Sequence, residues 1–168
     1  MEKLRGACKE NLRDRALIEV LLSTACRVSE IVGLNRQDID FDAGEATVTG
    51  KGSKERKVYF SEISLLHLKK YLDSRTDSTE ALFVTIGKPH KRISSGGIET
   101  RIREIGQSVE VEAYPHKFRR TGATMAAKRG MPIEQVQKLL GHERIDTTMI
   151  YAVVDQTEVK NSHRKYLG

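Results

Sequence analysis

The sequence predicts an α+β fold that is mainly α-helical and carries a small three-stranded antiparallel sheet. Three observations lead to this class. Apolar residues recur at helical spacing in several segments, short runs rich in Val and Thr flank a glycine-containing turn, and proline and glycine bracket two helices near the C-terminus. A chain of 168 residues has the size of one domain and buries roughly 70% of its unfolded surface. We therefore expect a single domain with one main core.

The first long helix is expected over residues 11–24. Its apolar positions recur three and four residues apart, with charged residues between them, as in an amphipathic helix. They are Leu12, Ala16, Leu17, Val20 and Leu21. After a break over residues 25–28, Ser29 is a suitable cap for a short helix that ends near Gly33. Arg27 is then expected on the connection between the two helices.

A β-hairpin is expected next, formed by residues 45–49 and 56–60, which are rich in Val, Thr, Tyr and Phe. Residues 50–53 supply the glycines of its turn, so Lys51 should lie near its tip. Residues 81–85 are predicted as the third strand. Two further helices are expected, one over residues 61–72 and one over 95–105.

The C-terminal third is predicted to be helical. Pro115 suits the first turn of a helix that runs to Arg129 and stops at Gly130, and Pro132 and Gly141 bracket another. Two helices joined this closely resemble a helix-turn-helix. Asp146 is expected to cap a short helix that carries residues 147–151, and residues 156–167 form a polar, weakly amphipathic segment.

Charge and composition limit the classes of partner and cofactor that we expect. With Lys+Arg 29 against Asp+Glu 23, the net charge is +6, which favours polyanions such as nucleic acid. The longest apolar runs, such as residues 20–22, are far too short to span a membrane, and no signal segment opens the chain. Cys8 and Cys26 are too few for a disulfide framework, which suits the cytoplasm. No histidine pair has metal-ligand spacing, so we expect no metal and no cofactor.

A set of cationic residues distributed along the chain suits phosphodiester chemistry. His116 and Arg119 lie three apart, so both project from one face near the N-terminal end of their helix, where an anion is favoured. Arg27 would approach from the other side, and two guanidiniums could stabilise the charge on a pentacoordinate phosphorus. His142 could supply one more donor to the same oxygens. The set predicts a site that binds a phosphodiester.

Tyr151 is the predicted nucleophile of this site. A phenol has a pKa near 10 and needs a base or a strongly positive site, and His116 is the nearest candidate base. The departing 5′-oxygen needs a proton, which Lys51 could supply from the flexible hairpin. Glu30 could orient Arg27 or His116. The remaining cations are interpreted as phosphate-facing or solvated charges: Lys54, Arg56, Lys117 and Arg120.

Four segments carry a family resemblance. Residues 24–31, 50–56, 116–121 and 139–151 resemble, in the same order, the signature blocks of the tyrosine recombinases, also called the phage integrase family. The resemblance implies the catalytic fold of that family and site-specific exchange of DNA strands. It also implies that Tyr151 forms a 3′-phosphotyrosyl bond and releases a 5′-hydroxyl, with no need for ATP or metal.

The resemblance carries further expectations about organisation. The family acts as a tetramer on double-stranded DNA with specific recombination sites, and the segment after its tyrosine commonly docks on a neighbouring subunit, which here is residues 152–168. Nothing here resembles the N-terminal DNA-clamping domain of the family, so residues 1–168 are expected to be one catalytic domain. We expect the domain to act on DNA in the bacterial nucleoid. The process would be the movement of a phage or another mobile element, or the resolution of chromosome dimers. Gly122 departs from the usual larger residue and is expected to permit close packing or DNA approach.

Two other functions remain open. A type IB topoisomerase would use similar residues to relax supercoils, although Leu-Leu-Gly-His followed by Ile-x-Thr-Thr favours a recombinase. A non-catalytic regulator would use residues 115–129 and 132–140 as a helix-turn-helix and bind DNA reversibly. That reading leaves Arg27, Lys51 and Tyr151 unexplained.

Overall fold

The computed structural model describes residues 1–50, 52, 54–142, 144–150 and 164–165. The elements named within these residues are mainly helices, with one short 3₁₀ helix (η1) and one hairpin. Their bounds are α1 (Glu2–Ala7), α2 (Leu12–Thr24), α3 (Val28–Gly33), η1 (Arg36–Asp38), β1 (Glu45–Thr49), β2 (Glu55–Tyr59), α4 (Glu62–Asp73), α5 (Ser95–Gln107), α6 (Pro115–Lys128), α7 (Ile133–Leu140) and α8 (Asp146–Met149). In this described part, no helix is both long and apolar enough to cross a membrane.

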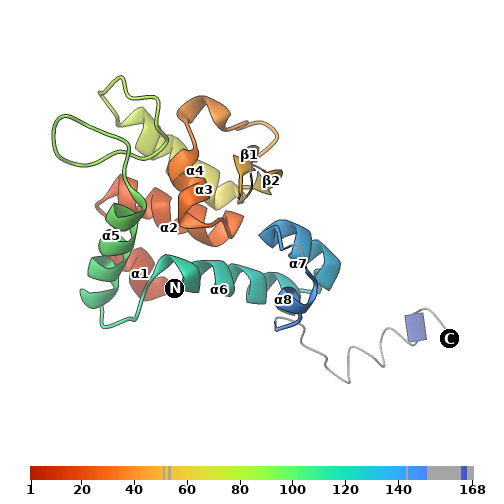
Figure 1. The fold of residues 1–168 in the computed structure, drawn as a ribbon. Helices are drawn as coiled ribbons and strands as arrows, with labels where there is room; N and C mark the ends of the chain where they lie inside the picture. The colour runs from red at the N-terminus through yellow and green to blue at the C-terminus, as the bar shows by residue number, and fades with distance from the viewer. Residues whose placement is uncertain (51, 53, 143, 151–163, 166–168) are drawn as a thin grey trace.

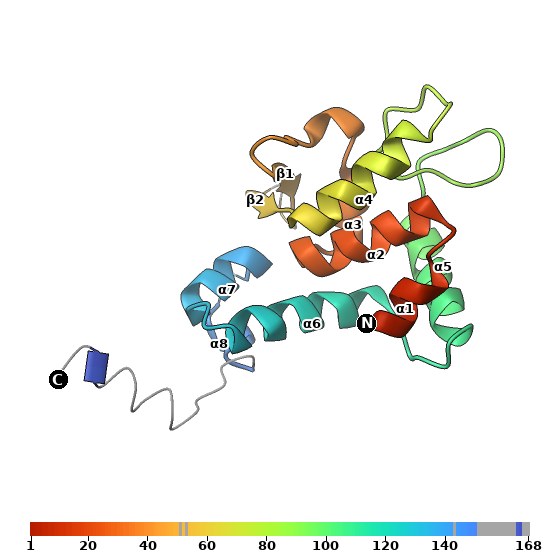
Figure 2. The ribbon, with the colours of Figure 1, turned by 180° about the vertical axis from the view of Figure 1, so that it is seen from behind.

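Helix α2 lies at the centre of the molecule. It packs against α4 on one side and α6 on the other, and α3 packs against β1 of the hairpin and against α5 (Figure 1). The reverse view shows α6 running along the body formed by α1 to α5, with α7 and α8 at its far end (Figure 2). The C-terminal ends of α2 and α7 therefore approach each other across α6.

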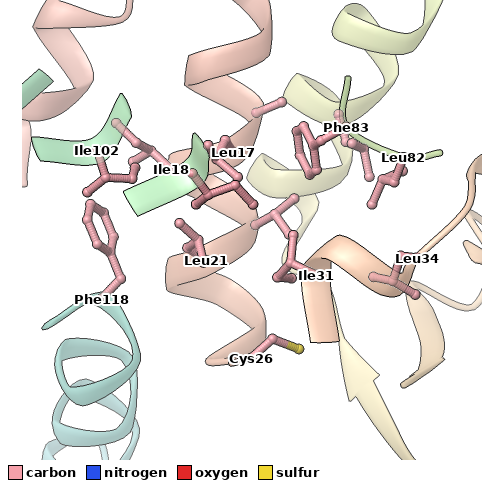
Figure 3. Close-up of a cluster of buried hydrophobic side chains, with 14 of the residues drawn as sticks. Leu17, Ile18, Leu21, Cys26, Ile31, Leu34, Leu82, Phe83, Ile102 and Phe118 are labelled. Atoms are coloured by element: carbon pink, nitrogen blue, oxygen red, sulfur yellow. The ribbon is translucent and has the colours of Figure 1, made fainter. Parts of the chain in front are cut away.

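The main core is built on the buried face of α2. Figure 3 shows side chains from α2, α3, α5, α6 and the 82–83 segment converging on one another. The labelled members that are fully or almost fully buried include Leu17, Ile18, Leu21, Ile31, Leu82, Phe83, Ile102 and Phe118. A smaller cluster of Ala25, Ala123, Val136 and Leu140 joins α7 to α6 and to the end of α2. Helix α6 thus contributes to both clusters, which fixes its position relative to α2 and α7.

Helix α2 begins as predicted and ends in a turn that directs Arg27 outward. The side chain of Asn11 caps its start by accepting a hydrogen bond from the Asp14 N–H at 3.0 Å. At its end, Ala25 adopts a left-handed conformation with φ 50. The buried Thr24 hydroxyl donates to the Val20 carbonyl at 2.7 Å and accepts from the Cys26 N–H at 3.3 Å. These bonds hold the connection on which Arg27 lies.

Helix α3 starts one residue before the predicted cap, so the assignment of Ser29 as its cap is wrong. The cap is Arg27, and the Glu30 carboxylate accepts the Arg27 backbone N–H at 2.7 Å. An acidic residue at the third helical position satisfies one of the N–H groups that the first turn leaves free. Glu30 therefore fixes the backbone at Arg27 as well as the start of the helix.

The predicted third strand is wrong, because residues 81–85 join no ladder. Within the described residues the sheet has two strands, β1 and β2, in the predicted hairpin with Glu45 opposite Tyr59. The 81–85 segment forms two isolated bridges, from Ala81 to Asn35 and from Val84 to Arg92. Side chains take the backbone groups that a ladder would need, since the Ala81 and Leu82 carbonyls accept from Arg75, and the Val84 N–H donates to the Tyr71 hydroxyl.

The other predicted helices are confirmed as α4, α5, α6 and α7. Ser61 caps α4 as expected, and Gly141 ends α7 in a left-handed conformation with φ 61. Helix α8 is present, but Ile145 is its cap, so the assignment of Asp146 as cap is wrong. Helix α1 was not predicted. The expected segment over residues 156–167 lies, apart from residues 164 and 165, outside the described residues.

Gly122 permits the close packing that was one of the two uses predicted for it. A Cβ at this position would lie 2.6 Å from the Leu22 carbonyl oxygen, which is closer than real Cβ contacts allow. Only glycine lets α6 approach the backbone of α2 at this point. The packing brings Arg119, one helical turn earlier on α6, to the C-terminal end of α2.

Candidate active site

Arg119 lies where the ends of α2 and α7 converge. It is buried, and its guanidinium donates to the Ala25 carbonyl at 2.7 Å and to the Leu140 carbonyl at 2.5 Å. The last carbonyls of a helix have no partner within the helix and carry partial negative charge, so they suit a buried cation. Burial, followed by the nearby charge of Arg27, lowers the pKa of Arg119 to about 10. The side chain is still cationic at neutral pH.

Glu30 joins two of the other cations. One carboxylate oxygen accepts from the Arg27 guanidinium at 3.1 Å, and the other accepts from the Arg56 guanidinium at 2.8 Å. Burial works to raise the pKa of this carboxyl, but the Arg27 backbone N–H and the charge and hydrogen bond of Arg56 outweigh it. The pKa of Glu30 therefore lies below its ordinary value, and the carboxylate is ionised at neutral pH.

Arg27 lines two pockets and is the residue that their linings share. The hairpin pocket, of about 530 Å³, is lined by Arg27, Glu30, Gly50, Gly52, Lys54, Glu55, Arg56, Gly141 and His142. The α6 pocket, of about 420 Å³, is lined by Cys26, Arg27, Val28, Ser29, Ser95, Glu99, Arg103, Tyr114, Pro115, His116 and Arg119. The Arg27 side chain is 41% exposed, so its guanidinium can meet a ligand.

His142 directly follows the glycine that ends α7 and lines the hairpin pocket. Its Nδ1 lies 2.9 Å from the hydroxyl oxygen of Thr148, a buried residue of α8. Burial, followed by the charges of Arg119, Arg27 and Arg56, lowers the pKa of the imidazole. The ring is therefore neutral at pH 7, and the Thr148 hydroxyl, which can donate to or accept from Nδ1, holds its orientation.

His116 lies in the first turn of α6, exposed at the mouth of the α6 pocket. Arg119 lines the same pocket one turn further along the helix. The structure thus places four of the six predicted catalytic residues, Arg27, His116, Arg119 and His142, around two pockets that share Arg27. An anion in this place would meet guanidiniums, imidazoles and the N-terminal end of a 14-residue helix.

Comparison with known proteins decides the family. The model of the phage integrase family matches residues 1–158 of this chain. This chain belongs to the phage integrase family. It is 35% identical to the tyrosine recombinase XerA of Pyrococcus furiosus over 156 residues, which are 92% of this chain and 54% of XerA. It is 38% identical to the tyrosine recombinase XerC of Salmonella typhi over 149 residues, 86% of this chain and 49% of XerC.

Solved structures agree with this assignment. The crystal structure of XerA recombinase matches with a TM-score of 0.82 and 28% identity, covering 98% of this chain and 62% of that one. The catalytic domain of bacteriophage HP1 integrase shares the fold, with a TM-score of 0.72, 22% identity and coverage of 98% and 89%. The predicted mainly helical fold and the predicted family are confirmed. The chain spans about half the length of the curated relatives it matches.

Two of the predicted catalytic residues, Lys51 and Tyr151, lie outside the described residues.

The predicted DNA-facing cations of this phage integrase family member differ in their exposure and in the groups that they contact. Lys54 lines the hairpin pocket, and Arg120 is exposed on α6. The Lys117 ammonium is bound to the Glu112 carboxylate at 3.0 Å and lies over the Tyr114 ring. Arg56 is mostly buried and bound to Glu30.

Two residues of the site have contacts that the sequence analysis did not anticipate. Arg56 was predicted to be a phosphate-facing or solvated charge. A signal for its partial burial was present, since Arg56 and the buried Val58 lie two apart on β2 and so share its inner face. Thr148 was not singled out, and no sequence signal distinguishes it from Thr147. Among the described residues, no group of three or more His, Cys, Asp or Glu side chains could hold a metal ion.

Proposed function

We propose that this chain is the catalytic part of a site-specific DNA recombinase that cleaves and rejoins strands through a 3′-phosphotyrosyl intermediate at Tyr151. The observation that carries the proposal is the convergence of Arg27, Arg119 and His142 on adjoining pockets in a phage integrase family fold. The XerA and XerC relatives are named tyrosine recombinases, and the fold is shared with XerH, whose structure was solved bound to its difH substrate.

The arginines would bind the scissile phosphate. Arg27 and Arg119 would donate to its non-bridging oxygens, which gain charge as phosphorus becomes five-coordinate. Their other bonds, to Glu30 and to helix-end carbonyls, hold both guanidiniums in place before DNA arrives. In the proposed mechanism the Thr148 hydroxyl would donate to Nδ1 of His142, which lies 2.9 Å away, so that Nε2 would carry the proton and donate to the same oxygens.

The reaction is a transesterification in which bonds are conserved. The Tyr151 oxygen would form a bond to phosphorus, and the bond between phosphorus and the 5′-oxygen would break. His116 would accept the phenolic proton, and Lys51 would protonate the departing 5′-oxygen. A 5′-hydroxyl of the partner duplex would then reverse the step. Because the phosphoester energy is kept in the protein–DNA bond, this sequence of steps consumes no ATP.

The proposal extends to assembly. Relatives about twice as long support the interpretation of residues 1–168 as the catalytic domain of a longer recombinase. We propose that four copies assemble on double-stranded DNA with specific recombination sites in the nucleoid. A groove of about 950 Å³ between α2, α4, α6 and α7 could receive residues 152–168 of the same or a neighbouring subunit. Its apolar lining includes Tyr59, Ile63, Met125 and Met131.

A nicked suicide duplex tests the chemistry. A pool of nicked duplexes with randomised sequence should yield a protein–DNA band that survives denaturation, because the nicked fragment diffuses away and prevents religation. Tyr151→Phe should bind the same DNA and form no band, since only the attacking oxygen is lost. Mass spectrometry should place the attached nucleotide on Tyr151, and attachment to another residue would refute the assignment.

Duplex and plasmid substrates also distinguish a recombinase from the two alternative functions, a type IB topoisomerase and a helix-turn-helix regulator. A recombinase joins the cleaved strand to a partner duplex, whereas a type IB topoisomerase relaxes a supercoiled plasmid without exchanging partners. A helix-turn-helix regulator gives reversible binding and no covalent band with any duplex. Sequencing the trapped DNA would identify the recombination site, and the site's position in the genome would distinguish a mobile element from chromosome-dimer resolution.

A further inference from the structure

Arg56 connects four parts of the site, although its side chain is only 14% exposed. It leaves β2 and donates to a Glu30 carboxylate oxygen on α3 at 2.8 Å and to the Leu139 carbonyl of α7 at 2.7 Å. The Cys26 sulfur, on the connection between α2 and α3, lies 3.9 Å from the same guanidinium. A planar guanidinium with several fixed donors suits this bridging position, and a lysine does not reproduce it.

The chain around His142 is shaped to receive this side chain. Gly141, the residue before His142, has φ 61, and a Cβ there would lie 2.7 Å from Cδ of Arg56. The turn that carries His142 therefore packs directly on the aliphatic part of Arg56. The hydrogen bond from Arg56 to the Leu139 carbonyl holds the residue two positions before this glycine.

Arg56 and Arg27 share the Glu30 carboxylate. The carboxylate oxygen that accepts from Arg56 also accepts the Arg27 backbone N–H at 2.7 Å, and the second oxygen accepts from the Arg27 guanidinium at 3.1 Å. Without Arg56, the buried carboxylate would lose one of its cationic partners and could rotate toward Arg27 alone. The Arg27 guanidinium would then be drawn away from a phosphate.

We propose that Arg56 is a positioning residue for strand cleavage, which acts through Glu30 to hold the Arg27 guanidinium in the orientation that binds the scissile phosphate. The inference rests on the proposed function, since it assigns the phosphate to Arg27. Arg56 itself is not required to touch DNA, because its guanidinium is already bound to Glu30 and Leu139.

A double-mutant cycle distinguishes a positioning role of Arg56, exerted through Arg27, from a general effect of its positive charge on cleavage. Arg56→Met should slow single-turnover cleavage of the trapped duplex on the order of 10- to 100-fold, the range expected when a reacting group is displaced by about 1 Å. In an Arg27→Ala background the same change should cost less than about 3-fold, because the residue on which Arg56 acts is gone. Equal losses in both backgrounds would show that Arg56 acts independently of Arg27 and would overturn the inference.

The matched control is Lys57→Met, which removes one positive charge from the adjacent residue of β2. Lys57 is exposed and pairs with Glu45 across the hairpin, away from the pockets. It should leave cleavage within about 2-fold in both backgrounds. If thermal unfolding shows that Arg56→Met does not fold, Arg56→Lys replaces it. This variant keeps the charge opposite Glu30, and it should give a smaller loss with the same dependence on Arg27.

Inorganic phosphate supplies a readout that needs no catalysis. Titration followed through the Arg27 side-chain N–H signals by NMR should show weaker binding in Arg56→Met than in the parent chain, and unchanged binding in Lys57→Met. In the Arg27→Ala background, phosphate binding is followed through the Arg119 side-chain signals. Adding Arg56→Met to this background should not weaken phosphate binding further. A parent chain that binds phosphate with this pattern but forms no covalent product would refute the proposed function alone. Unchanged phosphate binding in Arg56→Met would refute the positioning role alone.

Discussion

His142 Nδ1 lies 2.9 Å from the hydroxyl oxygen of Thr148, so a side chain of α8 is bonded directly to a residue of the cationic pocket. Thr148 is completely buried, whereas Thr147 beside it is exposed. The contact orients the imidazole. It also links His142 to α8, the helix that precedes Tyr151 in the chain. We therefore expect a change in the position of α8 to alter the position of His142, and the reverse.

Thr148→Val should slow DNA cleavage by about 10-fold, because it removes the hydroxyl that orients His142 while keeping nearly the same volume. Thr148→Ser retains the hydroxyl and should restore most of the rate. Thr147→Val is the matched control and should leave the rate unchanged. Single-turnover cleavage measures the rates, and NMR of the ring nitrogens of His142 reports the tautomer directly. An unchanged ring in Thr148→Val would contradict the role.

Arg119→Ala should lower the cleavage rate by on the order of 100-fold or more, as expected for a lost donor to a developing oxyanion. It should also lower stability, because the Ala25 and Leu140 carbonyls lose their partner. Arg120→Ala, at the next position of α6 and exposed, is the control. It should weaken DNA binding with little effect on the rate at saturating DNA. Similar cleavage rates for the two variants would be evidence against the site.

Lys51→Ala tests the proposed general acid. Cleavage of an ordinary duplex should slow strongly, because the 5′-oxygen is a poor leaving group without a proton. A duplex in which sulfur replaces that bridging oxygen should be cleaved at nearly the parent rate, since the thiolate needs no proton. Arg56→Met should not be rescued by the same substrate, because its defect is in phosphate binding. Failure of sulfur to rescue Lys51→Ala would remove the acid assignment.

Gly122→Ala should destabilise the protein by about 2 kcal/mol, because the new methyl group would lie against the Leu22 carbonyl oxygen. Gly6→Ala is the control, since nothing lies within 4 Å of a Cβ at that helical position. It should leave stability equal or slightly higher, because alanine favours a helix. Urea unfolding compares the two, and equal stability for both would show that α6 and α2 are packed less closely than described.

Asp77 supplies a pH dependence of stability outside the site. Its bond to Arg75, at 2.7 Å, holds the pKa of the Asp77 carboxyl well below its ordinary value. The folded state thus binds this proton less readily than the unfolded state does. The stabilisation is present above about pH 4, the ordinary pKa, and is lost as pH falls through the lower folded pKa. Asp77→Asn should cost about 2 kcal/mol at pH 7 and progressively less below pH 4, as measured by urea unfolding. A difference independent of pH would contradict this account.

Local patterns were sufficient for most of the fold. Apolar residues at helical spacing, together with capping, proline and glycine residues, located seven helices among the described residues, because a helix closes its hydrogen bonds within a few residues along the chain. The third strand could not be judged in this way. Residues 81–85 have strand composition, yet the Arg75 side chain takes two of their carbonyls, and composition does not reveal such a competitor.

The sequence alone determined the family, the order of the elements and the identity of the phosphate-binding candidates, since these depend on residue types and their local spacing. Only the tertiary structure decided how the candidates are held. Arg119 is bound by carbonyls from helices more than a hundred residues apart in the chain, and Arg56, expected as a phosphate-facing or solvated charge, is a mostly buried bridge to Glu30 and Leu139. Such contacts arise because packing brings the free ends of distant helices to the same buried place, and buried carbonyls there require donors.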